Sequence, residues 1–279
     1  MLEPLRDVLA WAAVFNHALT VEEIHRYITE KGSTDAVERA LRDASFAVCT
    51  NDRWHLRTAA YDTSHAEAQR KHAAAHLREV GPVLAQLAAS PTVEAMAITG
   101  SVAAGVNDEG GDVDLLIIAR PGHVWRVRAL AIYLQHNVPG GYRICPNMVI
   151  DRENIGLRPS VYAARELAMM RPVKGHDVLE SLVEANAWCR EHQPNAVMRN
   201  GFELPAPSGG MPWWWTVMRA PLAGRWAERW EAGRRISELQ SNSTSEETTY
   251  TMDRCVGHEN AHRSRIEREM RRILRESFA

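Results

Sequence analysis

The sequence predicts an α/β fold, in which a small mixed sheet is flanked by a winged-helix-like N-terminal module and a C-terminal helical region. Three observations support this prediction. Apolar runs of strand length alternate with helical periodicity between residues 61 and 175, which indicates an α/β core. Residues 1–60 contain three short helical patterns and a hairpin pattern. Residues 176–279 have helical periodicity without a clear strand, so we divide the 279-residue chain into these three parts.

The N-terminal module begins with apolar residues at helical spacing between positions 2 and 13. Thr20 with Glu23 three residues later is a capping-box pattern and predicts the start of a second helix. Asp35 is expected to start a third helix, and two apolar runs around the turn in residues 46–56 indicate a two-stranded wing. Three helices and a wing are typical of a winged-helix arrangement.

Winged modules often bind DNA, but they also serve as packing or protein-contact units. Here the second and third predicted helices carry four basic and six acidic residues, which is a poor surface for phosphates. The whole chain has a formal net charge of -2, so no global attraction to a polyanion is expected. Whether the module binds DNA stays open.

The core is predicted from a series of apolar segments between residues 65 and 161. The expected elements are a long helix (65–87), a strand (95–98), a Gly-Ser turn, a strand (113–119), a helix (123–135), a strand (143–150) and helices from about 161 onward.

The chemistry of the core is concentrated at four residues, Gly100, Ser101, Asp112 and Asp114. Gly100 and Ser101 follow a buried strand, where a turn without a bulky side chain allows a phosphate to approach the backbone. Asp112 and Asp114 are two residues apart on a strand, so their carboxylates point to the same face. Such hard oxygen ligands suit Mg²⁺ or Mn²⁺.

The spacing of these residues resembles the signature of the DNA polymerase beta-type nucleotidyltransferase superfamily. In that signature Gly-Ser is followed, after about ten residues, by Asp-hydrophobic-Asp, and here Ser101 and Asp112 are 112 − 101 = 11 positions apart. Further segments are similar to a subgroup of prokaryotic nucleotidyltransferase-domain proteins, and they include 19–24, 124–126, 144–147, 161–167, 170–172 and 182–188.

The resemblance implies a metal-dependent transfer of a nucleoside monophosphate from a nucleoside triphosphate (NTP), with release of pyrophosphate. Asp112 and Asp114 are then the catalytic metal ligands, and Gly100 and Ser101 hold the β- and γ-phosphates. The acceptor is not identified. A small molecule is favoured over a long nucleic acid because the chain is nearly neutral.

One departure from the family concerns the third carboxylate that active members usually carry on a later strand. Asn147 stands at the corresponding position, and an amide can ligate a metal but cannot take a proton. Asp151 has the same strand parity, about 13 Å further along, and is our third catalytic candidate. Glu166 and Glu184 on later helices are alternative bases.

Three arginines are candidates for nucleotide binding, since a guanidinium fork suits phosphate oxygens. Arg126 and Arg165 are included with Asn147 in the expected nucleotide-binding set, and Arg128 is a further candidate. Ion pairing within the fold is an equally valid interpretation of these arginines.

Other patterns compete with this interpretation. Residues 258–262 match HExxH, the zinc-protease pattern, but lie in a very polar segment. Trp226 and Trp230 are spaced like a core-facing helical stripe, which we favour over a membrane-interface patch. We therefore expect no membrane partner.

The four cysteines form no CxxC pair, and no secretory signal or apolar run of about 20 residues is found, so a reduced, cytoplasmic protein is expected. Homo-oligomers are compatible with the sequence.

The sequence is therefore compatible with two functions. The favoured one is a Mg²⁺- or Mn²⁺-dependent nucleotidyltransferase. The alternative is a catalytically weak nucleotide-binding or DNA-binding regulator on the same fold, which the missing third carboxylate favours.

Overall fold

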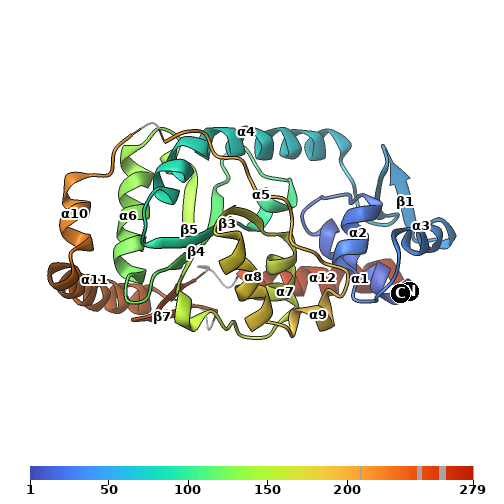
Figure 1. The fold of residues 1–279 in the computed structure, drawn as a ribbon. Coiled ribbons are helices and arrows are strands. Elements are labelled where there is room, and N and C mark those ends of the chain that lie inside the picture. The colour runs from blue at the N-terminus through green and yellow to red at the C-terminus, as the bar shows by residue number, and fades with distance from the viewer. Residues whose placement is uncertain (208, 244–246, 258–261, 279) are drawn as a thin grey trace.

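A six-stranded mixed sheet lies in the middle of the molecule, and helices cover both of its faces (Figure 1). The computed structural model describes residues 1–207, 209–243, 247–257 and 262–278. The predicted α/β class is confirmed. The strands of the sheet are, in spatial order, β6 (Arg171–Lys174), β3 (Val93–Ile98), β4 (Val113–Ala119), β5 (Ile144–Asp151), β8 (Arg254–Val256) and β7 (Thr249–Thr251).

The predicted core strands agree with β3, β4 and β5 to within two residues. Strands β4 and β5 run parallel, and the other neighbours in the sheet are antiparallel. The helices of the whole chain are α1 (Leu2–Ala13), α2 (Val21–Tyr27), α3 (Thr34–Asp43), α4 (Thr63–Ala88), α5 (Gly100–Ala104), α6 (Val124–Asn137), α7 (Val161–Met169), α8 (His176–Ala185), α9 (Cys189–His192), α10 (Trp213–Arg219), α11 (Pro221–Asn242) and α12 (His262–Phe278), with short 3-10 turns η1 (Gly141–Arg143) and η2 (Arg152–Asn154).

The two faces of the sheet are buried in different hydrophobic clusters. On β4, Leu115 and Ile117 belong to the larger cluster, which contains residues of α1, α4 and α6. Their neighbours Leu116 and Ile118 belong to the smaller cluster, with residues of α7 and α8. Successive side chains on a strand point to opposite faces, so a strand covered on both sides is apolar throughout. This explains why the strand is apolar without interruption from Leu115 to Ala119, after Asp114.

The N-terminal module consists of α1–α3 and a hairpin of β1 (Ala47–Thr50) and β2 (Arg53–Leu56). The predicted capping box is confirmed, because the Glu23 N–H donates to Thr20 and the Thr20 N–H donates to Glu23. The third helix begins at Thr34, and Ser33 rather than Asp35 is its cap. One continuous hydrophobic cluster joins this module to the sheet.

The C-terminal region is not purely helical, and this part of the sequence prediction is wrong. Strands β7 and β8 form a hairpin that extends the sheet beyond β5. Strand β6, inside the predicted core, was also missed and pairs with the other edge, at β3. These strands are three or four residues long, too short for an alternating pattern to be recognised.

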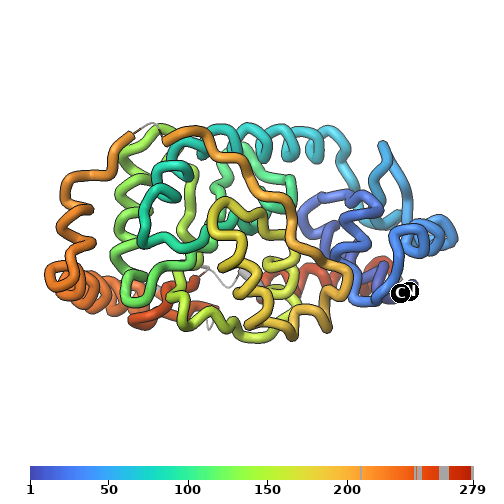
Figure 2. The backbone as a smooth tube through the Cα atoms, viewed as in Figure 1, coloured from blue at the N-terminus to red at the C-terminus, as the bar shows by residue number. Residues whose placement is uncertain are grey.

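The last helix returns to the start of the chain. Helix α12 packs against α1, and the Thr58 hydroxyl donates to Ser277 at 2.6 Å. Figure 2 shows the two ends of the chain at the same end of the molecule, while α10 and α11 lie at the opposite end. Trp226 and Trp230 of α11 are exposed, so their predicted core-facing role is wrong.

Within the part of the chain that the structure describes, no helix is both long and apolar enough to cross a bilayer.

Candidate active site

A pocket of about 580 Å³ lies where the N-terminal module meets the sheet. Strands β4 and β5, the start of α5 and helices α6 and α7 supply its polar lining. Trp11 of α1 and the following Phe15 and His17 form an apolar and aromatic wall, and residues of α11, β7, β8 and α12 complete it. The pocket therefore depends on all three predicted parts of the chain. Its volume lies in the range of small-ligand sites.

Asp112 and Asp114 are brought together in this pocket, as the sequence predicts. Asp112 is exposed and precedes β4 directly, whereas Asp114 is half-buried on the strand. Asp114 shares its strand face with Leu116 and Ile118, the face covered by α7. Burial raises the pKa of Asp114 to about 7, with further contributions from the charges of Asp112 and Glu166.

Gly100 lies directly against Asp114. Its φ is +66°, a conformation that favours glycine, and a Cβ at this position would clash with Oδ2 of Asp114. The preceding residue, Thr99, donates its N–H to the Asp114 carbonyl at 2.9 Å. The sequence Thr-Gly-Ser thus allows the backbone to pass close to the carboxylate.

The loop between Ser101 and Asp112 is held by Asn107. The Ser101 hydroxyl donates to Oδ1 of Asn107 at 3.2 Å, and Nδ2 of Asn107 donates to the Asp112 carbonyl at 3.0 Å. Gly111 is needed here as well, because a Cβ on it would overlap the Asn107 side chain. One buried amide therefore fixes the position of the Gly-Ser turn relative to the carboxylate pair.

Cys145 is the third side chain of the carboxylate cluster, and sequence reasoning missed it. It pairs with Asp114 in the parallel register of β4 and β5, and its Sγ lies within 4.8 Å of a carboxylate oxygen of both Asp112 and Asp114. Burial and the two nearby carboxylates raise the pKa of this thiol. It therefore remains protonated at neutral pH and donates to the carboxylates.

Glu166 on α7 reaches the pocket, while the other alternative base, Glu184, is an exposed residue of α8 that does not line it. Oε2 of Glu166 accepts the Gly100 N–H at 3.1 Å, and the Tyr162 hydroxyl also bonds to this carboxylate. Burial raises the pKa of Glu166, and these hydrogen bonds oppose the increase.

Arg128 and Arg165 supply positive charge to the same pocket. Arg165 is only 5% exposed and stacks over the Trp11 ring at 4.8 Å, and burial lowers its pKa to about 10. The Nε atoms of both arginines are buried and have no hydrogen-bond partner among the described residues. Buried N–H groups of this kind normally meet an acceptor, which a bound anion would supply.

The other expected nucleotide-binding residues divide into two groups. Ser101 and Asn147 line the pocket with Gly100. Arg126 does not, since its guanidinium is buried against Glu228 of α11, with Nε 3.1 Å from Oε2. Its other nitrogens donate to the carbonyls of Met218 and Gly122, so it ties the start of α6 to α10 and α11.

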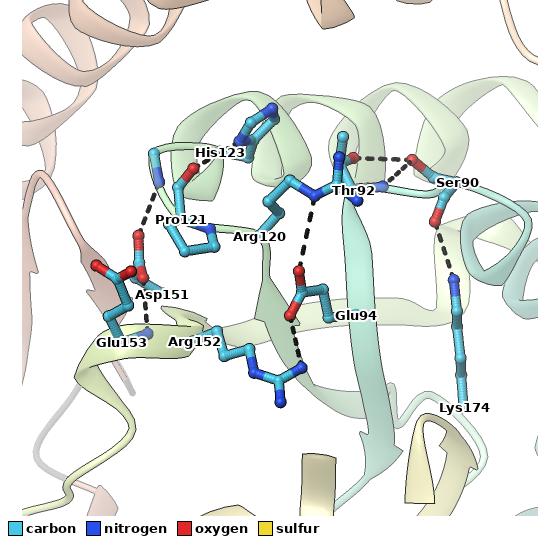
Figure 3. Close-up of polar contacts among 11 residues, drawn as sticks. Ser90, Thr92, Glu94, Arg120, Pro121, His123, Asp151, Arg152, Glu153 and Lys174 are labelled. Carbon is cyan, nitrogen blue, oxygen red and sulfur yellow. Dashed lines mark hydrogen bonds and ion pairs between the residues drawn. The ribbon is translucent and has the colours of Figure 1, made fainter. Parts of the chain in front are cut away.

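Asp151 lies at the far end of the sheet from the carboxylate pair. It is opposite Ala119, five residues along β4 from Asp114, which is about 17 Å. Figure 3 shows its carboxylate between the turn after β4 and the start of η2, where it accepts the N–H groups of Gly122 (2.8 Å) and Glu153 (2.9 Å). The structure thus gives the third carboxylate a turn-capping contact and does not bring it to the pocket.

Comparisons with protein-family models, curated proteins and solved structures give no match to this chain.

The site is therefore interpreted from its own chemistry. Three carboxylates and a thiol meet the guanidinium groups of the half-buried Arg128 and the buried Arg165 in one pocket, an arrangement suited to a polyanion bound together with a cation. The HExxH pattern at 258–262 lies, except for its last residue, outside the described residues.

Proposed function

We propose that this protein is a metal-dependent nucleotidyltransferase that transfers a nucleoside monophosphate from an NTP to an acceptor, with pyrophosphate as the other product. One observation carries the proposal: the pair Asp112 and Asp114 lines the same pocket as two arginines whose buried Nε atoms have no partner among the described residues. A metal-bound triphosphate matches both groups of side chains: its cation would pair with the carboxylates, and its phosphates would pair with the guanidinium groups.

The residues present fit a divalent cation. Burial and like charges disfavour ionisation of Asp114, and a cation between Asp112 and Asp114 would remove that cost. Mg²⁺ and Mn²⁺ suit the carboxylates, whereas the Cys145 thiol is a poor ligand for Mg²⁺. In this proposal Cys145 orients the carboxylates by hydrogen bonds and does not hold the metal. The cation would neutralise the phosphates and polarise the bond that breaks.

The protein side chains bind and orient the reactants. Arg128 and Arg165 contact the phosphates, and Ser101 with the Gly100 backbone positions the end of the triphosphate beside Asp112 and Asp114. A phosphate that takes the Gly100 N–H displaces Glu166. The released carboxylate, still beside Asp114, then accepts the proton of the acceptor hydroxyl or amine.

The acceptor in this proposal is a small molecule. Trp11, Phe15 and His17 close one side of the pocket, so the N-terminal module is part of the wall. A second cavity of about 520 Å³ shares Phe15, Ser101 and Val106 with the first, and it offers the acceptor a place next to the Gly-Ser turn. The chain has a formal net charge of -2, so its overall charge does not attract a long nucleic acid.

The test is transfer of label from each of the four NTPs, labelled at the α- or at the γ-phosphate, to the small-molecule fraction of a cell extract with Mg²⁺. Transfer of the α-label with release of pyrophosphate, lost in Asp112→Asn/Asp114→Asn, is the expected result. Transfer of the γ-label would instead indicate a phosphotransferase. Tight NTP binding without any transfer would sink the enzyme proposal.

That last outcome would support the second candidate, a nucleotide-binding regulator. The observation that favours it is the residue type on β5, where Cys145 and Asn147 lie in the pocket and no carboxylate does. Glu166 from α7 is the residue that separates the two proposals, because only the enzyme requires it as a base.

A further inference from the structure

Helices α10 and α11 lie at the end of the molecule opposite the N-terminal module (Figure 1). They carry exposed apolar residues with exposed basic residues beside them. Its apolar members are Trp213 (82% exposed) and Val217 (53%) of α10 with Leu222 (84%), Trp226 (69%) and Trp230 (56%) of α11. Its basic members are the exposed residues Arg219, Arg225 and Arg229. We call this set of eight residues the Trp–Arg face.

Helix geometry places the five α11 residues of this face on one side of the helix. Leu222, Trp226 and Trp230 are four residues apart and form a stripe along the helix, with the last two rings stacked at 6.4 Å. Arg225 and Arg229 follow one edge of this stripe. The opposite side of the helix is buried, through residues that include Ala227, Glu228 and Ala232.

The charge of this face is one-sided. The segment 213–234 contains only two acidic residues, Glu228 and Glu231, and both are buried. Glu228 is paired with Arg126, and Glu231 with Arg234 and Arg235. Within the described residues, none of the three arginines of the Trp–Arg face forms an ion pair. The face is therefore cationic although the whole chain has a net charge of -2.

The composition of the face selects among partners. A symmetric dimer through it would place the same arginines against one another, which is unfavourable. Single-stranded nucleic acid would use the tryptophans for stacking, but it gives no apolar environment to Leu222, the most exposed apolar residue of the face. Tryptophan and aliphatic side chains at headgroup depth, with arginines at lipid phosphates, are the pattern of helices that lie in a membrane interface.

We propose that the Trp–Arg face binds an anionic lipid surface, with α11 parallel to the bilayer plane. The contact is peripheral, because apolar residues cover only one side of the helix. The proposal does not depend on the proposed enzymatic function, since the face is separate from the pocket residues.

The experiment is co-sedimentation of the full chain with vesicles of phosphatidylcholine alone or with added phosphatidylglycerol. Two variants change exposed residues of the face: Leu222→Ser/Trp226→Ser and Arg225→Glu/Arg229→Glu. Two matched controls change exposed residues elsewhere: Val197→Ser for the apolar change and Lys31→Glu/Arg39→Glu for the charge change. Circular dichroism checks that all of them fold.

Binding to the phosphatidylglycerol vesicles, reduced by added salt, is the expected result. Each face variant should lower the partition coefficient at least about tenfold. The serine variant removes apolar side chains from the interface, and the glutamate variant replaces attraction to the anionic lipid by repulsion. Both controls should leave the partition coefficient unchanged. Equal binding to both lipids, no binding to either, or unchanged binding of the face variants would overturn the proposal. Two other results would also overturn it, if the protein does not bind vesicles: a dimer that the face variants abolish, or binding to single-stranded oligonucleotides that the face variants abolish.

Discussion

The backbone N–H of Gly100 donates to Oε2 of Glu166 at 3.1 Å, so a carboxylate occupies the amide that the proposed nucleotide site requires. A phosphate oxygen and this carboxylate compete for the same donor. Glu166 thus has two roles in the proposal: it opposes nucleotide binding in the free protein, and it serves as the base once displaced.

These two roles predict opposite effects of Glu166→Gln. The neutral amide repels phosphates less, so the Kd for the NTP should stay the same or fall severalfold. The amide cannot accept a proton, so kcat should fall by about 100-fold or more. Calorimetry and a pyrophosphate-release assay measure the two quantities, with the exposed Glu184→Gln as the control. A large rise in Kd with unchanged kcat would show that Glu166 only supports binding.

Substitution of three glycines separates backbone strain from close contact. Gly100→Ala combines a positive φ with a clash against Asp114, Gly105→Ala has the positive φ (+89°) in open space, and Gly110→Ala has open space without a positive φ. The loss in unfolding free energy should follow that order: roughly 2–4 kcal/mol, about 1 kcal/mol and near zero. Urea denaturation measures it. If Gly100→Ala and Gly105→Ala lower the unfolding free energy equally, the close contact between Gly100 and Asp114 contributes nothing to stability.

The stability of the protein should fall on acidification because of His17. Burial lowers the pKa of His17 to about 4, so the folded protein keeps it neutral while the unfolded chain binds a proton below the usual value of 6.5. The His17 contribution is therefore complete above pH 6.5 and is lost as the pH falls toward 4, by on the order of 3 kcal/mol. Urea denaturation between pH 4 and 8 should show a weaker pH dependence in His17→Gln than in the exposed control His65→Gln. Parallel curves would contradict this.

Arg126 and Arg165 should have different effects when each is replaced by Met. Loss of Arg126 leaves Glu228 buried without its partner, which should cost about 3–5 kcal/mol of unfolding free energy. Loss of Arg165 should chiefly weaken NTP binding, by about tenfold or more, because its guanidinium lines the pocket. Thermal unfolding with and without NTP compares them. NTP is expected to raise the Tm of the Arg126→Met variant but not that of Arg165→Met. The opposite pattern would mean that Arg126 binds the nucleotide and Arg165 does not.

Local sequence patterns predicted the elements around Asp112 and Asp114 well. The apolar runs of β3 and β4, the capping box of Thr20 and the parity of the two aspartates each depend on a few neighbouring residues. The register between strands could not be read from one sequence. A register shift between Asp114 and Leu116 decides which β5 residue faces the carboxylates, and Cys145 rather than Asn147 is the direct partner of Asp114.

The remaining errors concern tertiary contacts. Strand parity put Asp151 on the same face as Asn147 but could not show that its oxygens cap a turn. Periodicity identified the stripe of Trp226 and Trp230 but not which side of α11 the protein covers. The pairing of β8 with β5 joins residues about 100 positions apart, which no local pattern records.

The most direct test of the central claim is Mg²⁺-dependent binding of a non-hydrolysable NTP analogue, because it needs no knowledge of the acceptor. Calorimetric titration should show binding of the analogue that requires Mg²⁺ and that weakens at least about 100-fold in Asp112→Asn/Asp114→Asn, with Gly110→Ala as the unaffected control. Equal affinity with and without Mg²⁺, or full affinity in the double variant, would contradict a metal-bound triphosphate at Asp112 and Asp114.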